Sequence, residues 1–86
     1  MNRAQTLEHL ALAEKNGQIY AEQGDLKAIQ KLQHAVLDYW RPYAHKEQEH
    51  QPENAQIREK CIHVLCSLMR LGARVMGQQA LQERGA

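Results

Sequence analysis

The chain has 86 residues, a net charge of +1 and two cysteines. This length suits one domain, 1–86, with a modest core, and the nearly balanced charge does not indicate a nucleic-acid partner. No stretch is apolar enough for a membrane span, and residues 1–23 lack the apolar segment of a secretion signal. Two free thiols suit a reducing compartment, so we expect a cytoplasmic protein without membrane contact.

The composition predicts an all-α fold. Leu, Ala, Gln and Glu are abundant, and all four favour helix. Runs of alternating β-branched residues, which are typical of strands, are missing. We therefore expect a three-helix antiparallel hairpin or bundle with a long C-terminal helix.

A first helix is predicted over about residues 3–22. Its inner face by helical spacing is Ala4, Leu7, Leu10, Ala11 and Glu14. The pair Asn16-Gly17 either ends this helix or lies within it, where glycine costs about 1 kcal/mol. The residues that follow, 18–23, are polar but favour helix, so a continuous helix is expected.

A second helix is predicted over residues 26–42. Gly24 suits the C-terminus of the preceding helix and Asp25 the N-cap of this one. Pro42 ends or kinks the helix because proline lacks a backbone donor. The predicted apolar face is Leu26, Ile29, Leu32, Val36, Leu37, Tyr39, Trp40 and Tyr43. Residues 44–51 are polar and read as an exposed connection.

The third helix is predicted over residues 52–83, a length of about 45 Å. Its inner seam, with heptad-like spacing, is Ile57, Cys61, Val64, Leu68, Leu71 and Val75. A second seam one position over is Ile62, Leu65, Met69, Gly72 and Met76. The opposite column, which should face water, is His63, Ser67, Arg70 and Arg74.

Candidate catalytic and metal sites are weak. Cys61, His63 and Cys66 have a spacing that invites a zinc interpretation, but on one helix Cys61 and His63 point about 160° apart. Phosphate-binding glycine loops and nucleophile–base signatures are missing. We therefore expect no metal, no cofactor and no enzymatic activity.

The apolar width of the third helix indicates protein binding. The first two helices are each about 30 Å long, so they cover only one side of a 45 Å helix, and an apolar remainder marks an interface. The predicted partner-binding residues are Leu65, Leu68, Met69, Leu71, Val75 and Met76. The partner is expected to be another protein, a client or a regulator, and a homodimer is expected as well.

The segment from Ala21 to Leu32, with its Ala-x-x-Gly-Asp motif, resembles FliT-type flagellar export chaperones. The long apolar third helix resembles the layout of that family. The chain departs from the family at Leu26, where an aromatic residue is usual, and at Gln33, where an acid is usual. The resemblance implies a cytoplasmic chaperone that masks an amphipathic helix of a secretion substrate or a regulator.

The sequence is compatible with two alternative functions. The same physics serves a small anti-activator or phage-type inhibitor that masks a regulatory protein. A nucleic-acid-binding regulator would instead use Arg70 and Arg74 as phosphate contacts, although so few cations bind weakly.

Overall fold

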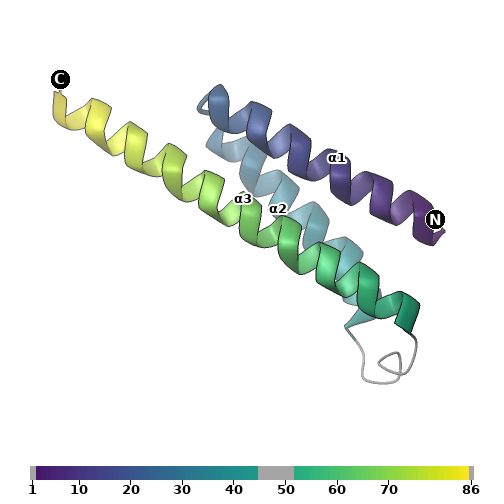
Figure 1. Cartoon of the computed structure of the whole chain (residues 1–86). Helices are drawn as coiled ribbons and strands as arrows, with labels where there is room; N and C mark the ends of the chain where they lie inside the picture. The colour runs from purple at the N-terminus through teal and green to yellow at the C-terminus, as the bar shows by residue number, and fades with distance from the viewer. Residues whose placement is uncertain (1, 45–51, 86) are drawn as a thin grey trace.

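The computed structural model describes residues 2–44 and 52–85, which form α1 (Arg3–Glu22), α2 (Leu26–Trp40), the 3-10 turn η1 (Arg41–Tyr43) and α3 (Pro52–Gly85) (Figure 1). These described residues contain no β-strand, so the predicted all-α fold is confirmed. The predicted connection lies mostly in residues 45–51, outside the described residues.

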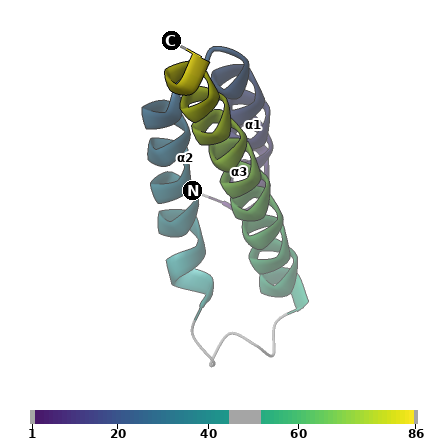
Figure 2. The same cartoon turned by 90° about the vertical axis from the view of Figure 1, so that its left-hand side faces the viewer.

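The helices run up, down and up, so α1 and α3 are parallel and α2 is antiparallel to both (Figures 1 and 2). α3 has 34 residues, against 20 in α1 and 15 in α2. It is about 50 Å long at 1.5 Å per residue, and its C-terminal end extends past the α1–α2 hairpin. The long third helix predicted from the sequence is confirmed.

α1 begins at a capping box. The Oδ1 atom of Asn2 accepts a hydrogen bond from the Gln5 backbone N–H at 2.9 Å, and the Asn2 N–H donates to Gln5 Oε1 at 3.1 Å. The reciprocal pair satisfies two backbone donors that have no partner within the helix. The entry into α1 is therefore encoded locally.

The turn between α1 and α2 follows the predicted Gly24-Asp25 pair. Gly24 has φ +70°, which glycine adopts without steric strain. The Asp25 N–H donates to the Tyr20 carbonyl at 2.9 Å, and the Asp25 carboxylate caps α2 by accepting from the Ala28 N–H at 3.1 Å. This turn sends α2 back along α1.

α2 ends at Trp40, two residues before the predicted end at Pro42. Because proline has no N–H and crowds the carbonyl four residues earlier, the chain tightens into η1 instead of continuing the α-helix. Arg58 in α3 donates a hydrogen bond from Nη1 to the Tyr43 carbonyl at 3.4 Å. This contact ties η1 to the beginning of α3.

The core lies where the three helices meet. Its buried apolar side chains include Leu10, Ala13, Ala21, Ile29, Val36, Ile57, Cys61, Val64, Leu68 and Val75. The inner seam of α3 supplies half of these, and its remaining member, Leu71, packs against them half-buried. The inner seam is thus confirmed as the packing face of α3.

The predicted inner face of α1 is wrong in part, since Ala4 and Ala11 are exposed. The buried residues are instead Thr6, Leu10, Ala13, Gly17 and Ala21. Gly17 lies inside a continuous helix, and a Cβ built there would overlap Cδ2 of Leu68. Small residues on this face therefore let α1 approach α3 closely.

Candidate functional site

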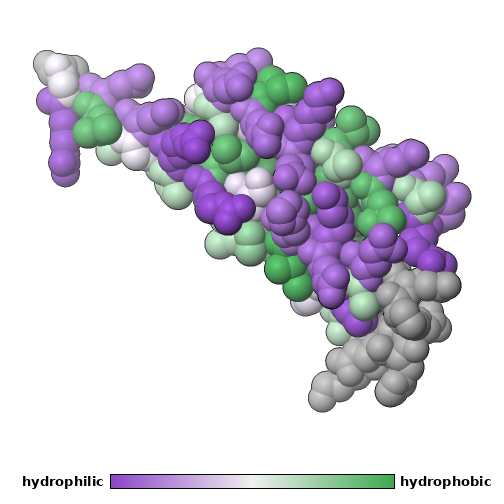
Figure 3. All heavy atoms as spheres, viewed as in Figure 1, coloured by the Kyte–Doolittle hydropathy of each residue, from purple (hydrophilic) through white to green (hydrophobic). Residues whose placement is uncertain are grey.

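The second seam of α3 divides into exposed and covered residues. Ile62, Met69 and Met76 are 55%, 58% and 52% exposed, and they lie at intervals of seven residues. Leu65 is half-buried. Gly72 is buried against α2, where a Cβ atom added to it would lie 3.7 Å from Leu26 Cδ1. Figure 3 shows hydrophobic atoms in a row along the edge of α3 away from α1. The second seam thus leaves a row of large apolar side chains in water.

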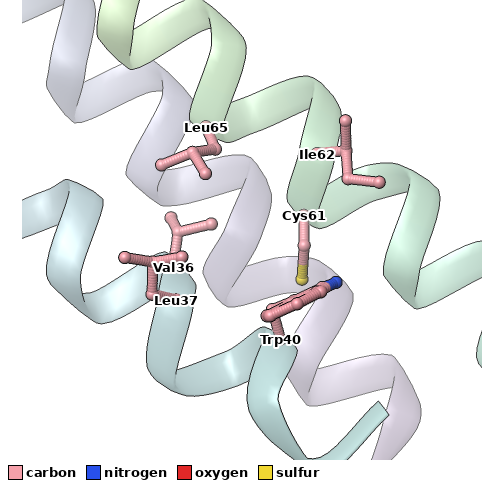
Figure 4. A pocket seen from close by; sticks show the side chains of 6 residues that line it. All are labelled: Val36, Leu37, Trp40, Cys61, Ile62 and Leu65. Carbon is pink, nitrogen blue, oxygen red and sulfur yellow. The ribbon is translucent and has the colours of Figure 1, made fainter. Parts of the chain in front are cut away.

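A small apolar hollow lies at the Ile62 end of this row, between α2 and α3. It has a volume of about 140 Å³ and is lined by Val36, Leu37, Trp40, Cys61, Ile62 and Leu65 (Figure 4). The Cys61 sulfur points towards the Trp40 ring. Sites for small-molecule ligands are usually about 300–1,000 Å³. A hollow of this size fits one apolar side chain of a partner rather than a cofactor.

The predicted partner-binding residues do not share one surface. Leu68 and Val75 are fully buried in the core, so this part of the prediction is wrong, because the inner seam faces α1 and α2. Leu65 and Leu71 are half-buried, on opposite flanks of α3. Met69 and Met76 are exposed as a binding role requires.

Ile62 belongs to the exposed row but was not among the predicted binding residues. Its signal was present in the sequence, since it stands seven residues before Met69. Leu37 and Trp40 were assigned to the inner face of α2, yet they border the hollow. We call the surface formed by Ile62, Met69, Met76 and this hollow the α2–α3 face.

The predicted phosphate contacts, Arg70 and Arg74, are both exposed on α3. Arg74 borders a shallow depression together with Gln18, Glu22 and Gln78. That depression therefore contains an acid as well as a cation. Two arginines about 6 Å apart along the helix make a small positive surface.

A charged cluster joins α1 to the flank of α3 next to it. Glu14 accepts from Lys60 Nζ at 3.5 Å and lies 3.3 Å from His63 Nε2 through its other oxygen. The described residues contain no group of three side chains that could hold a metal ion. Two further histidines, His45 and His50, lie outside the described residues. The cluster is best explained as a partly exposed ion pair between α1 and α3, of a kind that contributes little to stability.

The two cysteines differ in environment. Cys61 is buried, and desolvation raises the pKa of its thiol, whereas Cys66 is exposed. Because the thiolate is the reactive form, Cys61 is chemically quiet and serves as a core residue.

No helix within the described residues combines the length and apolarity that crossing a bilayer requires. No protein-family model, curated protein or solved structure matches the chain. The functional interpretation therefore rests on the residues and their geometry.

Proposed function

We propose that the protein is a non-catalytic helical adaptor of the chaperone type, which binds an amphipathic helix of a client or regulatory protein in the cytoplasm. The observation that carries the proposal is the row of Ile62, Met69 and Met76, each more than half exposed, with an apolar hollow at the Ile62 end of the row. Large apolar surfaces left open on a small protein are typical of interaction sites.

The α2–α3 face suits helix-in-groove binding. Residues seven apart on α3 match two turns of a bound helix, which reads such a surface through anchors at i, i+3 or i+4, and i+7. One apolar anchor enters the hollow between Trp40 and Leu65. The flexible methionines adapt to the remaining side chains of the bound helix.

The resemblance of residues 21–32 to FliT-type chaperones agrees with this proposal, because it implies the masking of an amphipathic helix. A nucleic-acid function has less support. The predicted basic column offers two exposed arginines, Arg70 and Arg74. Because affinity for nucleic acid grows with the number of phosphates neutralised, two arginines would bind it weakly.

The test is capture of partners from the native cell by tagged wild-type protein and by Met69→Glu. We expect the variant to keep its helical circular dichroism, since Met69 is exposed, and to lose the specific partner identified by mass spectrometry. The matched control is Leu12→Glu, which places the same charge at an exposed apolar residue of α1, outside the α2–α3 face. It is expected to retain the partner.

Two results contradict the proposal. One is equal loss of the partner in Leu12→Glu and Met69→Glu, which would indicate nonspecific adhesion. The other is full capture by Met69→Glu, which would place the binding site elsewhere on the molecule.

A further inference from the structure

An uninterrupted stripe of exposed apolar and small residues follows the outer side of α3. Its members are Ile62, Cys66, Met69, Ala73, Met76 and Ala80, separated by alternating steps of four and three residues, and all are exposed. This spacing is the heptad repeat of a helix–helix contact. The inner seam already packs within the chain, so α3 carries a second heptad seam, the outer stripe, without a partner among the described residues.

Large and small residues alternate along the outer stripe. One heptad position holds Ile62, Met69 and Met76, and the other holds Cys66, Ala73 and Ala80. Large side chains pack best against small ones on the facing helix, because facing positions then fill the space evenly. The stripe therefore calls for a partner helix with the reverse order of sizes.

A second copy running in the opposite direction supplies that order. When the two α3 helices are antiparallel about a two-fold axis at the level of residue 71, Met69 faces the partner's Ala73. In the same arrangement Cys66 faces the partner's Met76, and Ile62 faces the partner's Ala80. Every layer then pairs a large residue with a smaller one, and the two-fold symmetry repeats each pair.

A parallel pair has no such match. It would place Met69 against the partner's Met69 and Ala73 against the partner's Ala73, so that overfilled layers alternate with gaps. Both overpacking and cavities destabilise a contact. We propose that the outer stripe is the interface of a homodimer in which the two α3 helices pack antiparallel.

The stripe sets the strength of this dimer. Covering its exposed side chains on both copies removes roughly 1,000 Å² from water, which is near the lower limit for a specific interface. Arg70 lies near the partner's Arg70 at the two-fold axis, and Glu59 faces the partner's Glu83 at each end of the outer stripe. An interface of this limited area is expected to give a dissociable dimer.

The dimer does not rest on the proposed function, but it bears on it. The outer stripe contains Ile62, Met69 and Met76, so the second copy and a client helix compete for one surface. A free adaptor would then keep its apolar row covered until a client displaces the second copy.

Cysteine cross-linking tests the direction of the helices. In the antiparallel dimer, the two copies of Cys66 are about 15 Å apart along the axis, so wild-type protein does not form a disulfide. Met76→Cys places a thiol opposite the partner's Cys66, within the reach of a disulfide. Mild oxidation is expected to convert this variant into a covalent dimer on a non-reducing gel.

The matched control is Met76→Cys with Cys66→Ser, which leaves two thiols about 15 Å apart and is expected to stay uncross-linked. Sedimentation of wild-type protein over a concentration series is expected to show a monomer–dimer equilibrium, which Met69→Glu shifts to monomer without loss of helicity. Rapid cross-linking of wild type through Cys66 would overturn the antiparallel arrangement. A wild-type protein that stays monomeric throughout, with no cross-linking of Met76→Cys, would overturn the dimer while leaving client binding untouched.

Discussion

Replacing Gly17 by alanine places a methyl group inside the contact between α1 and α3. The new Cβ would overlap Cδ2 of Leu68 and would lie 3.6 Å from Cδ1 of Leu71. Leu68 has no exposed surface, so it cannot move aside into solvent. Either its rotamer changes within a packed core or α1 shifts away from α3.

The magnitude follows from two opposing effects. Overpacking a core by one methyl group costs about 1–3 kcal/mol. Alanine in place of glycine inside a helix returns about 1 kcal/mol. For Gly17→Ala we therefore expect a net loss of up to about 2 kcal/mol in the free energy of unfolding. Each kcal/mol lost lowers Tm by about 4–8 °C in a domain of this size.

Gly77→Ala is the matched control, since Gly77 also lies inside a helix but has no atom within 4 Å of an added Cβ. It is expected to raise the free energy of unfolding by about 0.5–1 kcal/mol. Both variants are measured by urea unfolding followed by far-UV circular dichroism. If Gly17→Ala gains stability as Gly77→Ala does, the close approach of α1 to α3 is refuted.

Three further predictions concern the turn and the cysteines. Gly24→Ala forces alanine to φ +70° and is expected to cost about 1 kcal/mol; an unchanged Tm would contradict this. At concentrations low enough for the protein to be monomeric, iodoacetamide is expected to label Cys66 in the folded protein and Cys61 only after unfolding, as mass spectrometry of the peptides would show; equal rates would place Cys61 in solvent. Because burial raises the pKa of Cys61, the unfolded chain loses that proton first as pH rises. The free energy of unfolding is therefore expected to fall as pH rises above the ordinary thiol pKa. Unfolding curves of Cys61→Ala, measured over the same pH range, should lack this fall.

The helix boundaries were predictable because strong local signals mark them. Gly24 and Asp25 act through backbone conformation and capping, which depend on neighbouring residues alone. Pro42 acts through its missing donor, although the sequence did not show that the α-helix would yield to a 3-10 turn at Trp40. The inner seam was predictable because its heptad spacing holds from Ile57 to Val75.

The packing face of α1 was not predictable from hydropathy. Ala13, Gly17 and Ala21 carry little apolar surface, and their role depends on how closely α3 approaches. The division of the second seam into exposed and covered residues was unpredictable for the same reason. Whether Met69 or Gly72 becomes covered depends on where α2 lies around α3, and the sequence of α3 contains no information about that angle.

The end of α3 beyond Gln79 has a distinct dynamic consequence. The Gln79 side chain donates to the Gly24 carbonyl at 3.3 Å, and the following side chains, 80–85, are all exposed. A helical end without tertiary packing opens readily, so its backbone amides are expected to exchange with deuterium far sooner than those around Val64. In an antiparallel dimer this end would lie beside residues 57–62 of the other copy. Slower exchange there, observed as protein concentration rises, would then provide a local measure of association.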